Sequence, residues 1–115
     1  MACVHEFGIF LDEDKSKEYI EYNPKRYQCI PVDDEIMSEL LDALAGMKTY
    51  FHSYDRPEYG LAYCGITLIP EESLAVFREI IVSSDCFHHS DELQALAALI
   101  DKAAREQKDL VHFGI

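Results

Sequence analysis

An apolar segment near the middle of the chain most restricts its fold. Side chains of a β-strand alternate between its two faces, and both faces of residues 61–69 are apolar. One face carries Leu61, Tyr63 and Ile69, and the other carries Ala62, Cys64, Ile66 and Leu68. A strand of this type lies in the centre of a sheet that is covered on both faces. We therefore predict a central strand over residues 61–69, with Gly65 as a bulge or a close contact with a helix.

The remaining elements follow from hydrophobic periodicity and turn residues. Strands are expected at 3–10, 48–53 and 110–115, with a short strand near 27–30 in the long polar segment before the first helix. Helices are expected over residues 33–46, over 70–82, and after an N-terminal cap at Ser90. These elements predict an α+β fold, with one mixed or antiparallel sheet of about four strands packed with three helices, in the order β-loop-α-β-β-α-α-β. At 115 residues the chain is expected to form a single domain, residues 1–115.

The four cysteines indicate a reducing environment. Their spacing contains no C-x-x-C pair, so neither a zinc ribbon nor a thioredoxin-like site is indicated. The acidic N-terminus is unlike a secretory signal, and no apolar run approaches the roughly 18 residues that a membrane span needs. We therefore expect a cytoplasmic protein with free thiols, in which Cys3 and Cys64 are small core residues.

The charge balance is strongly acidic. Ten Lys and Arg residues oppose 22 Asp and Glu residues, for a formal net charge of −12. This balance argues against binding to nucleic acid or to anionic membranes, because both need basic side chains. A basic protein is the expected partner, since a field of one sign speeds association with the opposite sign. The alternative is that acidity serves only solubility.

Catalytic and metal-binding patterns are weak. Histidines fall on expected strands at His5, His52 and His112, and His52 is close to Asp55 in the sequence, but none has a metal-site spacing. Cys86 stands near His88 and His89, as a nucleophilic catalytic cysteine would require. An ordinary loop is the simpler explanation of this segment. The acidic pairs at residues 33–34 and 71–72 suit helix starts, where the helix dipole favours negative charge. No catalytic residue, metal ligand or cofactor is therefore predicted.

A tyrosine-containing acidic surface is the strongest candidate for binding. It combines the polar segment before the first helix with the outer row of that helix. Carboxylates and tyrosine rings together suit Arg and Lys side chains of a partner. The alternative is that the tyrosines hold the long segment against the domain. The predicted contact residues are Asp12, Glu13, Asp14, Glu18, Tyr19, Glu21, Tyr22, Glu35, Glu39 and Asp42.

Three segments resemble a family of small, acidic, uncharacterised bacterial proteins. They are HEFGI at residues 5–9, MKTYFHSYDRPEYGLAYCGITLIP at 47–70, and HFGI at 112–115. Proteins of this type are similar in size and acidity to immunity proteins of bacterial toxin systems, including contact-dependent inhibition. The resemblance implies no particular binding residues.

Three functional hypotheses remain. The leading one is a non-enzymatic immunity protein that binds and neutralises a basic toxin, with a nuclease as the expected target, since nucleases carry basic clefts for phosphate. The alternative is a small enzyme or metal-binding domain that uses His5, His52, Asp55 and His112. A homo-oligomeric structural protein is the third.

Overall fold

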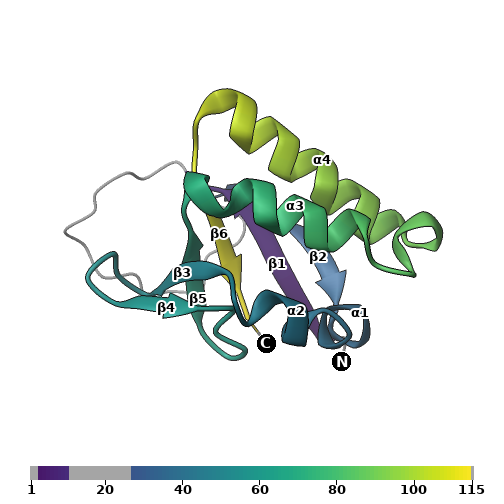
Figure 1. The fold of residues 1–115 in the computed structure, drawn as a ribbon, viewed down its shortest axis with the longest axis horizontal. Helices are drawn as coiled ribbons and strands as arrows, with labels where there is room; N and C mark the ends of the chain where they lie inside the picture. Colours follow the sequence, from purple (N-terminus) through teal and green to yellow (C-terminus); the bar gives the residue numbers. More distant parts are fainter. Residues whose placement is uncertain (1–2, 11–26, 115) are drawn as a thin grey trace.

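The fold is a six-stranded antiparallel sheet with helices on one face (Figure 1). The computed structural model describes residues 3–10 and 27–114. The strand order is β2-β1-β6-β5-β3-β4, and every neighbouring pair is antiparallel. The strands are β1 (Val4–Ile9), β2 (Ile30–Asp33), β3 (Lys48–Phe51), β4 (Pro57–Tyr59), β5 (Ile66–Ile69) and β6 (Leu110–Phe113).

Two longer helices, α3 (Leu74–Val82) and α4 (Asp91–Glu106), pack side by side across the sheet. The short helices α1 (Asp34–Ser38) and α2 (Leu41–Leu44) lie at one end of the strands (Figure 1). The 3-10 turns η2 (Glu71–Ser73) and η3 (Phe87–His89) precede α3 and α4. Ser90 caps α4 as predicted, because its hydroxyl accepts a hydrogen bond from the Leu93 N–H at 3.1 Å.

Apolar side chains fill both faces of the central strands. The helix-covered face contributes Phe7, Ile9 and Leu110 to a core shared with α3 and α4. The opposite face carries a smaller, aromatic-rich core. Its buried members are Phe10, Tyr27, Ile66, Leu68, Val111 and Phe113. The predicted central strand is therefore confirmed for residues 66–69, all of which are buried.

The prediction of about four strands and three helices was wrong in number. The structure has six strands and four α-helices in its described residues. The expected helix over residues 33–46 is divided into α1 and α2, and the Leu40 N–H bonds to the Met37 carbonyl in a tightened turn between them. This turn allows Met37, Leu40 and Leu44 to be buried together. The burial of these side chains therefore outweighs the local preference for one continuous helix.

The expected strands were also displaced or missed. The strand predicted near residues 27–30 lies at Ile30–Asp33, and the segment between the strands expected at 48–53 and 61–69 contains β4. Residues 61–65 form a loop and turn before β5, not part of the strand. β2 and β4 are the two edges of the sheet, and each contains a proline, Pro31 or Pro57. Proline suits an edge strand because it has no N–H to donate to a neighbour.

The prediction that Cys3 and Cys64 are core residues was wrong. Both are exposed, and none of the four cysteines, all of which the structure describes, forms a disulfide. Burial, assisted by the nearby Glu6, raises the pKa of the Cys29 thiol to about 12. That thiol is therefore protonated at neutral pH and is a poor nucleophile. Among the described residues, no helix has the length and apolar character needed to cross a membrane.

Candidate functional site

The predicted acidic surface is described only in part. Three of its residues, Glu35, Glu39 and Asp42, are exposed near α1 and α2. Because the helix is divided, they do not form one continuous row. The other seven predicted contacts lie outside the described residues: Asp12, Glu13, Asp14, Glu18, Tyr19, Glu21 and Tyr22.

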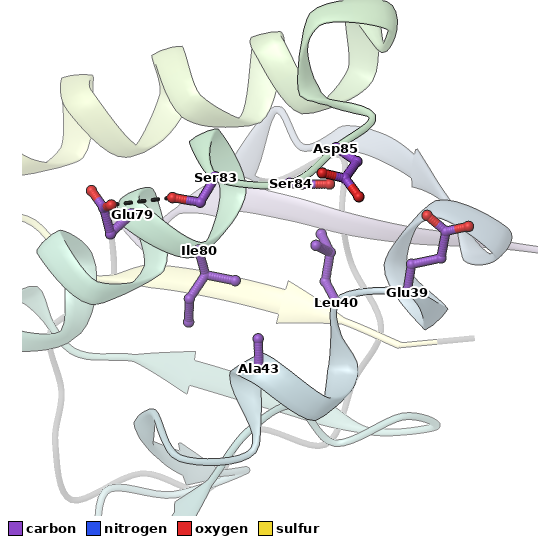
Figure 2. A pocket seen from close by; sticks show the side chains of 8 residues that line it. All are labelled: Glu39, Leu40, Ala43, Glu79, Ile80, Ser83, Ser84 and Asp85. Atoms are coloured by element: carbon purple, nitrogen blue, oxygen red, sulfur yellow. Dashed lines mark hydrogen bonds between the residues drawn. The ribbon is translucent and has the colours of Figure 1, made fainter.

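Glu39 borders an open groove between α2 and α3, with a volume of about 470 Å³ (Figure 2). Its apolar side chains come from Leu40, Ala43 and Ile80. In Figure 2, the carboxylates of Glu39 and Asp85 lie on one side of these apolar side chains and that of Glu79 lies on the other. The complete lining is Glu39, Leu40, Ala43, Glu79, Ile80, Ser83, Ser84 and Asp85.

No basic side chain of the described residues neutralises this groove. Its lining contains three carboxylates, those of Glu39, Glu79 and Asp85, and no Lys or Arg. The ion pairs that Lys and Arg form in the described part of the chain are Lys48–Glu72 at 3.6 Å and Arg78–Asp101 at 2.7 Å. Both lie outside the groove lining. The groove therefore combines apolar contact area with uncompensated negative charge.

A second pocket, of about 430 Å³, lies beside Tyr50 and Tyr54. Two of its three carboxylates, those of Glu72 and Asp109, have partners within the chain. Glu72 pairs with Lys48, and Asp109 accepts hydrogen bonds from the Tyr54 hydroxyl at 2.7 Å and from the Glu71 N–H at 2.7 Å. Since two of its three acids are engaged within the chain, this pocket is the weaker candidate for binding a cation.

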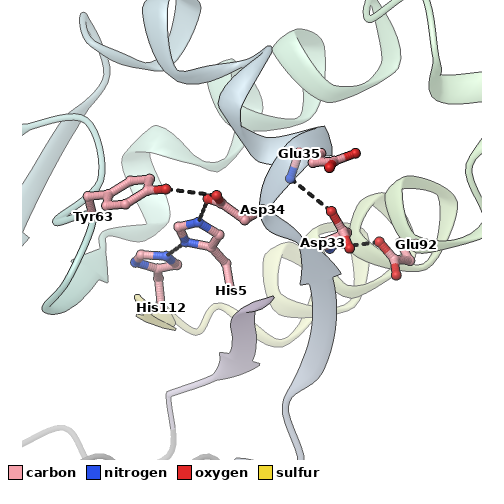
Figure 3. Close-up of polar contacts among 7 residues, drawn as sticks. All are labelled: His5, Asp33, Asp34, Glu35, Tyr63, Glu92 and His112. Carbon is pink, nitrogen blue, oxygen red and sulfur yellow. Dashed lines mark hydrogen bonds and ion pairs between the residues drawn. The ribbon is translucent and has the colours of Figure 1, made fainter. Parts of the chain in front are cut away.

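A chain of polar side chains crosses the helix-covered face of the sheet (Figure 3). The His5 and His112 rings, on the neighbouring strands β1 and β6, stack with centroids 5.1 Å apart and planes at 17°. His5 Nδ1 lies 2.8 Å from His112 Nε2, and His5 Nε2 lies 2.8 Å from Asp34 Oδ1. The chain ends at Thr67, 3.1 Å from His112 Nδ1, and at Tyr63, whose hydroxyl donates to Asp34 Oδ2 at 2.7 Å. We call these five side chains the histidine relay.

The partners of the relay determine the direction of its hydrogen bonds. Thr67 Oγ1 accepts from the Ala62 N–H at 2.8 Å, so its own hydrogen is available to His112 Nδ1. His112 then donates from Nε2 to His5 Nδ1, and His5 donates from Nε2 to the Asp34 carboxylate. With both rings neutral, every hydrogen has an acceptor.

Burial and hydrogen bonding shift the pKa values of three groups in the relay. Desolvation, together with the neighbouring His5, lowers the pKa of His112 well below its usual range. The hydrogen bonds from His5 and Tyr63 lower the pKa of the Asp34 carboxyl. The bond to Asp34 raises the pKa of the Tyr63 hydroxyl. His112 is therefore held as a neutral ring, and Asp34 is held as a carboxylate.

The relay has limited access to a substrate. His5 and His112 have no exposed surface, whereas the Asp34 side chain is 21% exposed and Tyr63 is 40% exposed. Nucleophilic or acid–base catalysis needs a group within hydrogen-bonding reach of the substrate. Only the Asp34–Tyr63 end of the relay meets that condition. The buried histidines can orient Asp34 but cannot touch a bound molecule.

The structure brings together two of the four residues in the enzyme or metal hypothesis, His5 and His112. His52 lies instead against Gly65, since its Nε2 is 2.8 Å from where a Cβ on that glycine would stand. Asp55 is exposed. The described residues contain no group of three or more His, Cys, Asp or Glu side chains that could hold a metal.

Sequence reasoning missed the role of Asp34 and Tyr63. The expected dipole role fits Asp33, which caps α1 by accepting from the Glu35 N–H at 2.8 Å (Figure 3). The adjacent Asp34 binds His5 instead. One signal was available. His5 stands two and four residues before Phe7 and Ile9, and His112 stands two residues after Leu110, so the strand period places both histidines on apolar faces.

Comparisons of the chain with protein-family models, with curated protein sequences and with solved structures gave no match, so the proposals below depend on geometry and charge.

Proposed function

We propose that the chain is a non-enzymatic immunity protein that binds a basic bacterial toxin, a nuclease, and neutralises it by covering the positively charged active-site cleft. The observation that carries the proposal is the acidic surface around the α2–α3 groove. The groove lining contributes three carboxylates, those of Glu39, Glu79 and Asp85, and no Lys or Arg.

The physical argument is electrostatic complementarity. A nuclease needs Lys and Arg side chains in its cleft to bind phosphates. A surface with the opposite charge can occupy the same cleft and exclude the nucleic acid. Complementary fields also raise association rates by about 10- to 1,000-fold, which suits a protein that must capture a toxin before it acts.

The test is binding to, and inhibition of, the toxin encoded beside the gene of this chain. We expect binding to weaken strongly when NaCl rises from about 0.1 M to about 1 M, because the Debye length falls from about 10 Å to about 3 Å. Nuclease activity should fall in proportion to the toxin bound. Egg-white lysozyme, a basic protein without nuclease activity, is the control for unspecific attraction.

The outcomes are distinct. Affinity for the toxin that does not change with salt contradicts electrostatic docking. Toxin binding that leaves nuclease activity intact contradicts neutralisation at the cleft. Equal affinity for lysozyme and toxin would show that the acidic surface attracts basic proteins in general and is not specific for the toxin.

The contact between His5 and His112 favours one second candidate, a small enzyme or metal-binding domain. In such a protein, Asp34 would be the group that meets the substrate or metal, and the histidines would position it. Calorimetric titration with ZnCl₂ tests the metal form. Stoichiometric binding that is lost in Asp34→Asn and retained in Asp55→Asn would favour this candidate over the immunity protein.

A further inference from the structure

We infer that the α2–α3 groove receives an arginine side chain from the basic partner. This inference rests on the proposed function, because it names the chemistry that the partner presents to the acidic surface.

The floor of the groove suits the aliphatic stem of a long basic side chain. Leu40 is 5% exposed, Ile80 is half-buried and Ala43 is exposed, so the three offer an apolar surface without a deep enclosed cavity. Lys and Arg bury their methylene stems on such surfaces while keeping the charged head near water. A carboxylate-bearing or purely polar ligand would gain nothing from this floor.

The rim of the groove suits the charged head. Glu39, Glu79 and Asp85 are all exposed, and none of them has a Lys or Arg partner in the described residues. The groove also has neutral groups at its edge, since Ser83 donates to Glu79 at 3.1 Å. A cation placed over Leu40 therefore meets Glu39 and Asp85 on the side of the groove that Figure 2 shows opposite Glu79.

Arginine fits this arrangement better than lysine or a metal ion. Its planar guanidinium can donate two parallel hydrogen bonds to one carboxylate and is more weakly hydrated than an ammonium group. Calcium needs six to eight oxygen ligands, and a groove with an apolar floor does not surround an ion in that way. The guanidinium also tolerates contact with apolar side chains, because its faces are poorly hydrated.

The experiment uses nona-arginine and nona-lysine peptides as probes of the complete chain. The groove variant is Glu39→Gln, Glu79→Gln and Asp85→Asn. The matched control is Asp55→Asn, Glu58→Gln and Glu106→Gln, which removes the same three charges from exposed positions outside the groove. Affinities are measured by calorimetry, and circular dichroism checks that each variant keeps its fold.

We expect the groove variant to bind nona-arginine about tenfold or more weakly than the unmodified chain, and the control variant less than about threefold more weakly. Equal losses in the two variants overturn the inference, because they show a response to net charge alone. Nona-lysine should bind the unmodified chain more weakly than nona-arginine. Equal affinity for the two peptides overturns the preference for arginine.

A steric variant tests the groove without changing charge. Ala43→Trp fills the floor from an exposed position, so the fold should remain intact while nona-arginine binding falls. Binding that does not change in this variant also overturns the inference. Ala98→Trp, on the exposed side of α4, is its control.

The inference and the proposed function fail in different ways. If the toxin binds the unmodified chain and the groove variant equally well, the groove is not the contact and the immunity function stands. If the toxin does not bind but nona-arginine binding depends on the groove, the arginine site stands and the immunity function fails.

Discussion

His112 and His5 are polar side chains in a position that apolar residues usually occupy. Both are completely buried, and His112 also packs on the Phe7 ring with centroids 4.9 Å apart. A buried polar group without a partner costs about 1–3 kcal/mol. Here every ring nitrogen has a partner, so the pair is tolerated as a connected network whose members depend on one another.

We predict that His112→Phe destabilises the domain by roughly 2–4 kcal/mol, because phenylalanine keeps the ring but leaves His5 Nδ1 and the Thr67 hydroxyl without their partner. Urea unfolding followed by circular dichroism measures the change. The control is His89→Phe at an exposed position, which should stay within about 0.5 kcal/mol. Similar values for both variants would show that the relay contributes little to stability.

The relay also predicts a dependence of stability on pH. The folded state lowers the pKa of His112 below 6.5, the usual value for histidine, so below that pH the unfolded chain binds a proton that the folded chain resists. Unfolding therefore becomes easier as pH falls, by at most about 1.4 kcal/mol per pH unit for this group. The lowered pKa of Asp34 adds a second loss of stability in the same direction, below the usual carboxyl value of 3.8.

Urea unfolding between about pH 7 and about pH 5 checks the contribution of His112, because carboxylates remain ionised in most of that range. We expect the free energy of unfolding to decrease through the window. His89→Phe should show the same slope as the unmodified chain, because His89 is exposed and is not part of the histidine relay. Constant stability across the window contradicts a neutral buried His112.

At the scale of single elements, α4 gives the clearest test of local sequence. Ser90 is 8% exposed, and its side chain accepts from the third N–H of the helix. We predict that Ser90→Ala destabilises the domain by about 1 kcal/mol, the usual cost of losing such a cap. Ser38→Ala, at an exposed position in α1, is the control and should change the free energy of unfolding by less than about 0.5 kcal/mol.

Elements with strong local signals were predicted from the sequence, and those formed by tertiary contacts were not. The cap at Ser90 and the apolar period of α4 identify that helix without further information. The division between α1 and α2 has no Gly or Pro to mark it, and depends on the burial of Met37, Leu40 and Leu44. β4 is exposed at all three residues, so it shows no alternation, and pairing with β3 alone defines it.

In the candidate sites, too, the sequence indicated local properties of single residues but not the contacts between distant ones. The sequence indicated that Glu39 is acidic and exposed, but its place in one groove with Glu79 and Asp85 depends on the packing of α2 near α3. The distance of 107 residues between His5 and His112 hid their contact, which follows from the pairing of β1 with β6. The similar segments at the two ends of the chain are neighbours in the sheet.

For the whole molecule, the excess of carboxylates over basic side chains determines the electrostatic contribution to stability. The two Lys and Arg ion pairs of the described residues are exposed, and exposed pairs contribute only about 0–1 kcal/mol each. Repulsion among the remaining carboxylates should therefore outweigh attraction within the folded domain. This acidity should destabilise the isolated chain, and a basic partner of the proposed kind would relieve the repulsion.

We therefore predict that NaCl raises the free energy of unfolding between about 0.02 M and about 0.3 M, because screening weakens repulsion in the compact state more than in the expanded one. Urea unfolding at several salt concentrations measures the slope. The variant Glu39→Gln, Glu79→Gln and Asp85→Asn should be more stable than the unmodified chain at low salt, and its slope should be shallower. A decrease in stability with salt would mean that internal ion pairs dominate, and that the groove carboxylates are less available to a cationic partner than their geometry suggests.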